Sequence, residues 1–211
     1  MKKLFFTLFV FATSVFCCNA YAQKKDSCAH RYVGIGIRSA IFSISELQQS
    51  IMPPNRVMLS VDPIKYVRVE GQFGMYSNAK DQYVSSSPAP VMLKMKEGAS
   101  ISGCGLFGVY PIDKVKFLAG FRYMTSAYSK DNFQYSTYGS VPAIVTDKGK
   151  ITTISGVIGA EYNFSKWFSA GAEFSLLNMN DDFTPANPTS PKINSKTTIT
   201  ESCLVFRFYP Y

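Results

Sequence analysis

Histidine and cysteine, on which many enzyme and metal sites depend, are scarce in this chain. One histidine, His30, and five cysteines occur among its 211 residues. No cysteine pair has the CxxC form that indicates zinc or redox chemistry, and no GxGxxG run opens a helix to hold a phosphate group. Asp181 and Asp182 could hold a divalent cation weakly, but adjacent carboxylates point to different sides, so a solvated turn is favoured. The sequence predicts no catalytic residue, no metal site and no cofactor.

Charged side chains are also few, at 17% of the chain, whereas 14 glycines, 13 tyrosines and 17 phenylalanines are present. This composition is too apolar and aromatic for a disordered chain. The formal net charge is +8, from 22 basic and 14 acidic residues. Without Lys2 and Lys3 it is +6, which fits an anionic lipid surface or a phosphate-bearing partner. The excess is too dispersed to predict binding to nucleic acid.

Long hydrophobic runs are absent except at the N-terminus. Lys2 and Lys3 precede an apolar run over residues 4–18, and Ala20 and Ala22 supply the small residues that a signal peptidase reads. We expect residues 1–22 to be an export signal and residues 23–211 to form one domain. An anchor helix is the alternative, but the run is shorter than the ~18 apolar residues that span a bilayer. Lipidation at Cys17 or Cys18 is the second alternative, although bulky Phe16 precedes them.

Export would place the three remaining cysteines, Cys28, Cys104 and Cys203, in an oxidising compartment. Because three is an odd number, at least one thiol is free. We expect all three to act as small apolar residues on strands or near a terminus.

After residue 22 the dominant pattern is an alternation with period two, which is typical of strands whose two faces meet different surroundings. In residues 67–76, Val67, Val69, Phe73 and Met75 share one face, and the opposite face carries Arg68. We expect eight strands, over residues 32–41, 55–62, 67–76, 100–110, 117–124, 152–163, 168–176 and 197–209. The second is the weakest, because Pro53-Pro54 and Asp62-Pro63 confine it.

The connections between these strands alternate between short and long. Residues 63–65, 111–114 and 165–166 are tight, whereas residues 44–54, 77–99, 127–151 and 178–196 are long and polar, and residues 43–51 would also permit a short amphipathic helix. Short turns at one end and long loops at the other are typical of barrels in outer membranes. The sequence therefore predicts an all-β fold, an eight-stranded antiparallel up-and-down transmembrane β-barrel with periplasmic termini.

Closure into a barrel satisfies every backbone polar group in lipid, and eight strands leave an interior only wide enough for side chains. With the apolar faces outward, the inward faces collect charges that must pair with one another. The expected interior polar network comprises Arg38, Arg68, Glu70, Arg122, Glu161, Glu173 and Arg207. A structural plug is the main interpretation, and a gated ion path or proton relay through the same residues is the alternative.

Aromatic side chains cluster where the membrane interfaces would lie, as in the girdles of outer-membrane barrels. Near the short turns the expected girdle comprises Tyr66, Tyr110, Tyr162, Trp167, Phe168 and Tyr209, with Phe164 beside them. Near the outer ends it comprises Tyr76, Tyr123 and Tyr128.

Several segments resemble the small outer-membrane β-barrel proteins of Bacteroidetes-type bacteria, which are similar in architecture to OmpA-like and OmpX-like barrels. They are DPIKYVRVEGQFGMYS (62–77), FLAGFRY (117–123), the hairpin GAEYNFSKWFSAGAEF (159–174) and the closing LVFRFYPY (204–211). The resemblance implies an address in the cell outer membrane and recognition of the last strand by the barrel-assembly machinery, although Pro210 departs from the usual ending. It implies no particular activity, because small barrels serve many roles.

Position also argues against an enzyme. His30 precedes the first strand, on the periplasmic side, whereas a hydrolase or acyltransferase of this architecture needs its histidine at the outer rim. Lysines gather in the long loops, where they would attract outer-membrane lipid and lipopolysaccharide phosphates. They are Lys80, Lys94, Lys96, Lys130, Lys148, Lys150, Lys192 and Lys196. We expect a non-enzymatic barrel that serves envelope integrity or surface interaction with an unknown partner; the alternative is a narrow channel or transport-associated barrel.

Overall fold

The computed structural model describes residues 33–43, 55–84, 91–134, 143–186 and 190–210. The expected export signal, His30, Cys28 and the expected helix, apart from its first residue Ser43, lie outside these residues. Within the described ranges, no helix is long and apolar enough to cross a membrane. Cys104 and Cys203 are both free thiols, the first exposed and the second buried.

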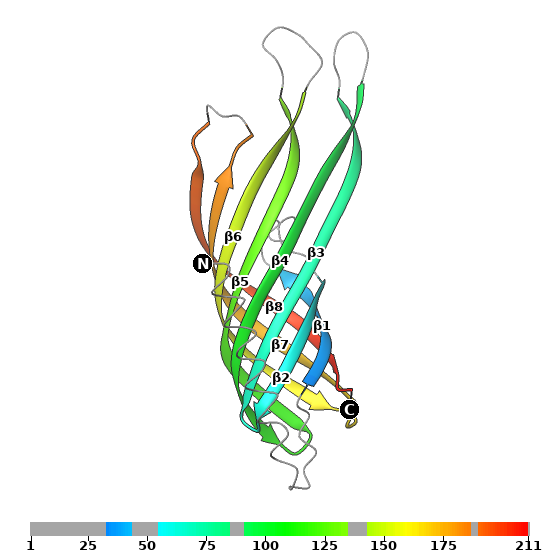
Figure 1. The fold of residues 1–211 in the computed structure, drawn as a ribbon, viewed down its shortest axis with the longest axis vertical. Helices are drawn as coiled ribbons and strands as arrows, with labels where there is room; N and C mark the ends of the chain where they lie inside the picture. The colour runs from blue at the N-terminus through cyan, green and yellow to red at the C-terminus, as the bar shows by residue number, and fades with distance from the viewer. Residues whose placement is uncertain (1–32, 44–54, 85–90, 135–142, 187–189, 211) are drawn as a thin grey trace.

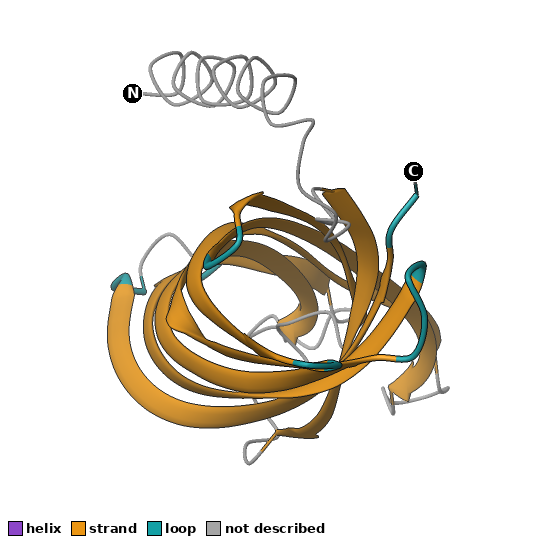
Figure 2. Cartoon of the chain, turned by 90° about the horizontal axis from the view of Figure 1, so that it is seen from below, coloured by secondary structure: helices purple, strands orange, loops and turns teal. Residues whose placement is uncertain are grey.

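Eight antiparallel strands form one closed barrel in which each strand pairs with its neighbours in sequence and β8 pairs with β1 (Figures 1 and 2). This confirms the predicted fold class. The strands are β1 (Val33–Ser43), β2 (Asn55–Ile64), β3 (Val67–Val84), β4 (Val91–Ile112), β5 (Val115–Gln134), β6 (Ala143–Asn163), β7 (Phe168–Thr184) and β8 (Ile193–Phe208).

The alternation in sequence sets the two faces of the wall. In β3, Phe73 and Met75 are exposed on the outside while Arg68, Glu70 and Gln72 are buried inside. The antiparallel register carries this parity to the neighbouring strand, because Phe73 pairs with Ser102 and Arg68 with Phe107. Successive side chains of a strand point to opposite faces, so one register assigns every residue of the wall.

Three short turns and the end of β8 lie at one end of the barrel, which we call the turn end. The turns contain Lys65-Tyr66, Asp113-Lys114 and residues 164–167. Asp113 has a φ of 50°, a left-handed conformation that Asp tolerates better than most residues and that allows the tight reversal between β4 and β5. Pro63 lies where the pairing of β2 with β3 shifts register, which explains how β2 keeps ten residues despite its proline.

The opposite end, which we call the hairpin end, differs from the sequence expectation. Residues 77–99, 127–151 and 178–196 were expected to be loops, but most of them are strand. Pairing of β3 with β4 continues to Val84 and Val91, and pairing of β5 with β6 continues to Gln134 and Ala143. The alternation fades in the outer parts of these segments because both faces meet water there, whereas the backbone pairing that defines a strand does not depend on it. The tall hairpins are prominent in Figure 1.

Candidate functional site: a filled barrel interior

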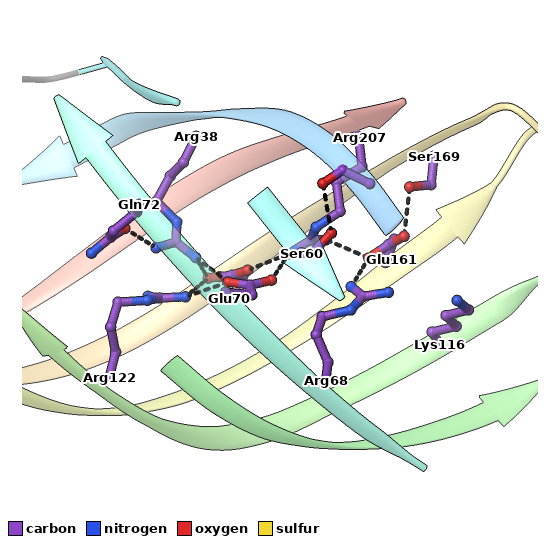
Figure 3. A network of polar contacts seen from close by, with 12 residues as sticks. Arg38, Ser60, Arg68, Glu70, Gln72, Lys116, Arg122, Glu161, Ser169 and Arg207 are labelled. Atoms are coloured by element: carbon purple, nitrogen blue, oxygen red, sulfur yellow. Dashed lines mark hydrogen bonds and ion pairs between the residues drawn. The ribbon is translucent and has the colours of Figure 1, made fainter. Parts of the chain in front are cut away.

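The interior is filled by charged side chains, which we call the ionic layer (Figure 3). Seven of the eight strands contribute to it at inward positions. Its members are Arg38, Arg56, Arg68, Glu70, Arg122, Glu161, Glu173, Glu201 and Arg207, all of them buried. The structure places all seven residues of the expected network in this layer and adds Arg56 and Glu201.

Near the turn end the layer is organised around Glu161. Its Oε2 lies 2.6 Å from Nη1 of Arg68 and also accepts from Arg207, while its Oε1 accepts from the hydroxyls of Ser169 (2.5 Å) and Tyr209 (2.6 Å). Arg68 also donates to Asp62, with distances of 2.6 and 2.9 Å. The guanidinium of Arg68 and the carboxylate of Glu161 are therefore saturated with hydrogen bonds to or from charged groups, the form in which buried charge is tolerated.

Towards the middle of the barrel, Glu70 and Glu173 share the remaining arginines. Arg122 reaches both carboxylates, at 3.3 and 3.0 Å, and Arg207 also bonds both. Arg38 pairs with Glu173 and donates to the Oε1 of Gln72 at 2.9 Å. Because Arg207 contacts Glu161 as well, it connects this group with the one near the turn end.

Arg56 and Glu201 form a further bidentate pair, with 3.2 Å between Nη1 and Oε2. With these two residues, Asp62 and Lys116, whose ammonium lies 3.3 Å from Asp62, the set holds five arginines and one lysine against four glutamates and one aspartate. The expectation of four positive against three negative residues was incomplete. Strand parity could have found both missing partners, because Arg56 shares the face of Met58 and Ser60, and Glu201 shares the face of Arg207.

On its hairpin-end side the ionic layer is covered by apolar side chains, which we call the apolar layer. Its core is Ile101, Met124, Ile151 and Leu177, all almost fully buried, and Tyr128, Met179 and Ile199 pack against it. Met124 follows Arg122 on β5, and Leu177 lies beyond Glu173 on β7. The interior is therefore closed twice, once by ion pairs and once by hydrocarbon.

The aromatic residues expected in the girdle at the turn end face outward, with one exception. Tyr66, Tyr110, Tyr162 and Trp167 are exposed on the outside of the wall. The aromatic rings of Phe168 and Phe208 lie 5.1 Å apart, and the ammonium groups of Lys65 and Lys166 lie over the rings of Tyr66 and Trp167. Such rings with a lysine beside them suit a lipid headgroup zone.

Tyr209 corrects the expected girdle. Only 4% of it is exposed, and its hydroxyl donates to Glu161 inside the barrel. The ring fits because residue 34 is glycine: a Cβ there would lie 2.9 Å from the Tyr209 ring. Proximity to the turns suggested a girdle position, but the parity of β8, in which Val205 and Arg207 point inward, decides the direction.

The prediction of an aromatic girdle near the outer ends is also largely wrong, since Tyr76 and Tyr128 point inward. Tyr76 donates to Glu97 at 2.8 Å and Tyr128 to Asp181 at 3.1 Å. Of the three, Tyr123 is exposed on the outside. The outward apolar surface instead ends towards the hairpins in a row of hydroxyl and amide side chains: Ser77, Ser102, Thr125, Thr152, Asn178 and Thr198.

Asp181 and Asp182 point to opposite faces of β7, where they accept hydrogen bonds from Tyr128 and Asn194 respectively. In the described part of the chain, no three His, Cys, Asp or Glu side chains are placed to share a metal ion.

Buried arginines and glutamates within a wall of exposed isoleucine, leucine and phenylalanine invert the arrangement of a water-soluble barrel. A closed sheet leaves no backbone group unpaired towards lipid, and a polar interior with an apolar exterior is the pattern of barrels that cross membranes. The molecule is a transmembrane β-barrel with a side-chain-filled interior.

No family model matches the chain, and no curated protein sequence matches it. Among solved structures, it is similar to Ail, the attachment invasion locus protein of Yersinia pestis, crystallised with the heparin analogue sucrose octasulfate. That likeness has a TM-score of 0.44 and 11% identity, and covers 84% of this chain and 95% of that one. Acinetobacter baumannii CarO2 gives a TM-score of 0.37 and 11% identity, over 85% of this chain and 98% of that one. The fold assignment rests on the strand pairing of this chain itself.

Proposed function

We propose that the protein is a non-enzymatic barrel of the cell outer membrane, whose closed interior anchors long hairpins that face the outside of the cell. The observation that carries this proposal is the double closure of the interior by the ionic and apolar layers. Removing one partner from a buried ion pair costs about 3–5 kcal/mol, so transient opening of the whole layer is disfavoured. Envelope integrity and surface interaction are then the roles left to the barrel.

Orientation follows from the asymmetry of the two ends. Short turns face the periplasm in outer-membrane barrels, and long connections face outward. The turn end carries the aromatic rings with their lysines, and we infer that it lies at the periplasmic interface. Recognition of β8, which ends at Phe208, by the barrel-assembly machinery belongs to the same proposal.

Lipid of the outer leaflet is the first partner we propose. Lys148, Lys150 and Lys196 share the parity of the outward apolar residues and lie beyond the row of hydroxyl and amide side chains. Next to Lys150, a shallow depression of about 130 Å³ is lined by Phe73 and the hydroxyl-bearing Ser100, Ser102 and Thr125. Ammonium and hydroxyl groups at this height suit the phosphates and sugars of lipopolysaccharide.

The proposal is tested on the mature chain in cells and in planar bilayers. We expect heat-modifiable migration from the outer-membrane fraction, cleavage of the hairpins by protease added to intact cells, and no conductance. A steady conductance that Glu70→Ala or Arg122→Ala alters would overturn it in favour of the channel alternative. Recovery in a soluble fraction without a mobility shift would overturn the membrane placement itself.

A further inference from the structure

The wall of the barrel divides at the hairpin end, between β4 and β5. Their pairing stops at Glu97 and Lys130, whereas both strands continue for several residues in their own hairpins. The two hairpins separate at this point, as Figure 1 shows. The resulting cleft has a volume of about 350 Å³. We call it the fork; it is lined by Lys80, Gln82, Met95, Lys96, Glu97, Lys130, Asp131, Asn132 and Phe133.

Two strand edges face each other across the fork. The backbone N–H of Lys96 donates to Oδ2 of Asp131 at 2.9 Å, so a side-chain carboxylate occupies the position where the next strand-to-strand bond would form. Beyond this contact, no backbone pairing between β4 and β5 is found in the described part of the chain. Such edges accept an added strand readily, because their donors and acceptors repeat at the spacing of an extended peptide.

The charge available to a ligand in the fork is positive. Glu97 is occupied by Lys80 (3.7 Å) and by the hydroxyl of Tyr76, and Asp131 accepts from Thr146 as well as from the Lys96 backbone. Lys96 and Lys130 have no carboxylate within 4 Å among the described residues. Neutral donors do not cancel a carboxylate charge, so the lining of Lys80, Lys96, Lys130, Glu97 and Asp131 keeps a net charge of +1. This excess favours an incoming acidic group.

The fork also lies away from the lipid. Lys130 follows Thr125, in the row that ends the apolar surface, by five residues, or about 17 Å along the strand. Met95 and Phe133 add apolar contact area beside the two edges. Strand edges, lysines and apolar side chains together match a polypeptide better than a lipid headgroup, which offers no repeating backbone.

We infer that the fork binds an extended acidic segment of a partner protein, which adds as a strand to the edge of β4 or β5. It places one carboxylate on Lys96, on the outward face of the wall, and another on Lys130, on the inward face. This inference rests on the proposed function only in requiring that the hairpins be accessible outside the membrane. Main-chain bonds would provide the affinity and the two ion pairs the preference for acidic sequence.

The test uses the mature barrel in phosphatidylcholine nanodiscs and a fluorescein-labelled nine-residue peptide of Glu and Thr. A central Glu-Glu pair in this peptide puts a carboxylate on each face of the added strand. We expect saturable binding by fluorescence anisotropy, loss of binding when alternate peptide nitrogens are N-methylated, and loss when Lys replaces Glu in the peptide. Lys130→Glu should weaken binding about tenfold, because it removes an attraction and adds a repulsion. Lys192→Glu, an equally exposed position outside the fork, is the matched control and should not weaken it.

Heat-modifiable migration of each variant verifies that it folds. Equal binding of the N-methylated peptide, or of a sulfated oligosaccharide that Lys130→Glu weakens to the same extent, would overturn the inference in favour of a general anion site. Absence of peptide binding would also overturn it, and if protease still reaches the hairpins on intact cells, the proposed function survives that result. Inaccessible hairpins would overturn both.

Discussion

Strand β5 (Val115–Gln134) passes through two regions of the molecule that are held by different forces. In its first half, Arg122 and Met124 point into a filled interior while Phe121 and Tyr123 face outward. In its second half, Lys130 and Asp131 meet water, and Asp131 accepts one bond from each neighbouring strand, from Lys96 of β4 and from Thr146 of β6. Pairing with β6 continues through both halves, whereas pairing with β4 stops at Lys130. The comparison therefore separates what interior packing contributes from what backbone pairing alone provides.

The largest difference in stability between the two regions should appear when a carboxylate is removed from each. Glu161→Ala removes the acceptor that Arg68, Arg207, Ser169 and Tyr209 share. Arg68 keeps Asp62, and Arg207 keeps Glu70 and Glu173, but the buried network loses one negative charge and two guanidinium bonds. We expect a loss of about 3–5 kcal/mol in the free energy of unfolding. Urea titration in lipid vesicles, read as the loss of heat-modifiable migration, measures it.

Glu97→Ala is the matched control, because Glu97 also accepts several bonds but lies among the hairpins with Lys80 exposed beside it. Its loss should stay below about 1 kcal/mol. Equal losses for the two variants would contradict the division into two regions.

A second comparison concerns the apolar layer. Leu177 is 0% exposed and packs with Ile101, Met124 and Ile151, so Leu177→Ala should leave a cavity and cost about 3 kcal/mol. Met92→Ala, at an exposed position of the β3–β4 hairpin, should be nearly neutral. The same unfolding titration applies, and planar bilayers check whether Leu177→Ala admits ions. A stability unchanged by Leu177→Ala would show that the layer is not a packed core.

The third comparison locates the membrane boundary. Phe121 and Tyr83 are 72% and 73% exposed, yet the first lies in the apolar wall and the second on a hairpin beyond it. Phe121→Arg should cost about 2–3 kcal/mol, because it places a cation against lipid, whereas Tyr83→Arg should cost almost nothing. Unfolding in vesicles of two bilayer thicknesses provides the measurement. A similar loss in the free energy of unfolding at both positions would show that the proposed membrane boundary is wrong.

The same boundary explains what the sequence could and could not predict. Val67, Phe73 and Phe121 were assigned to the outward face correctly, because a strand between lipid and a polar interior must alternate. Above Met75 both faces of β3 meet water, so the alternation disappears although the strand continues to Val84. Those segments were therefore mistaken for loops.

Within the site, strand parity proved more informative than distance from a turn. Parity placed Arg207 in the interior, and it would have placed Glu201 and Tyr209 there as well. Proximity to the turns instead put Tyr209 in the aromatic girdle. Which carboxylate each arginine bonds depends on the register and tilt of all eight strands, which no local pattern contains.

The smallest expected effect tests whether the outer hairpins have a stability of their own. The hydroxyl of Tyr76, which donates to Glu97, holds the pKa of that carboxyl below its ordinary value, and Asn78 and Lys80 act in the same direction. A lowered pKa in the folded state means that the ionised form stabilises the fold. This contribution is present above the ordinary pKa of Glu and is lost as the pH falls through the folded value.

Amide hydrogen exchange around Tyr76 and Asn78 should therefore speed up below about pH 4 by more than the intrinsic pH dependence allows. Glu97→Gln should remove that transition, while protection near Arg122 stays unchanged in both proteins. A transition of equal size in both regions would mean that the hairpins and the filled barrel unfold as one unit.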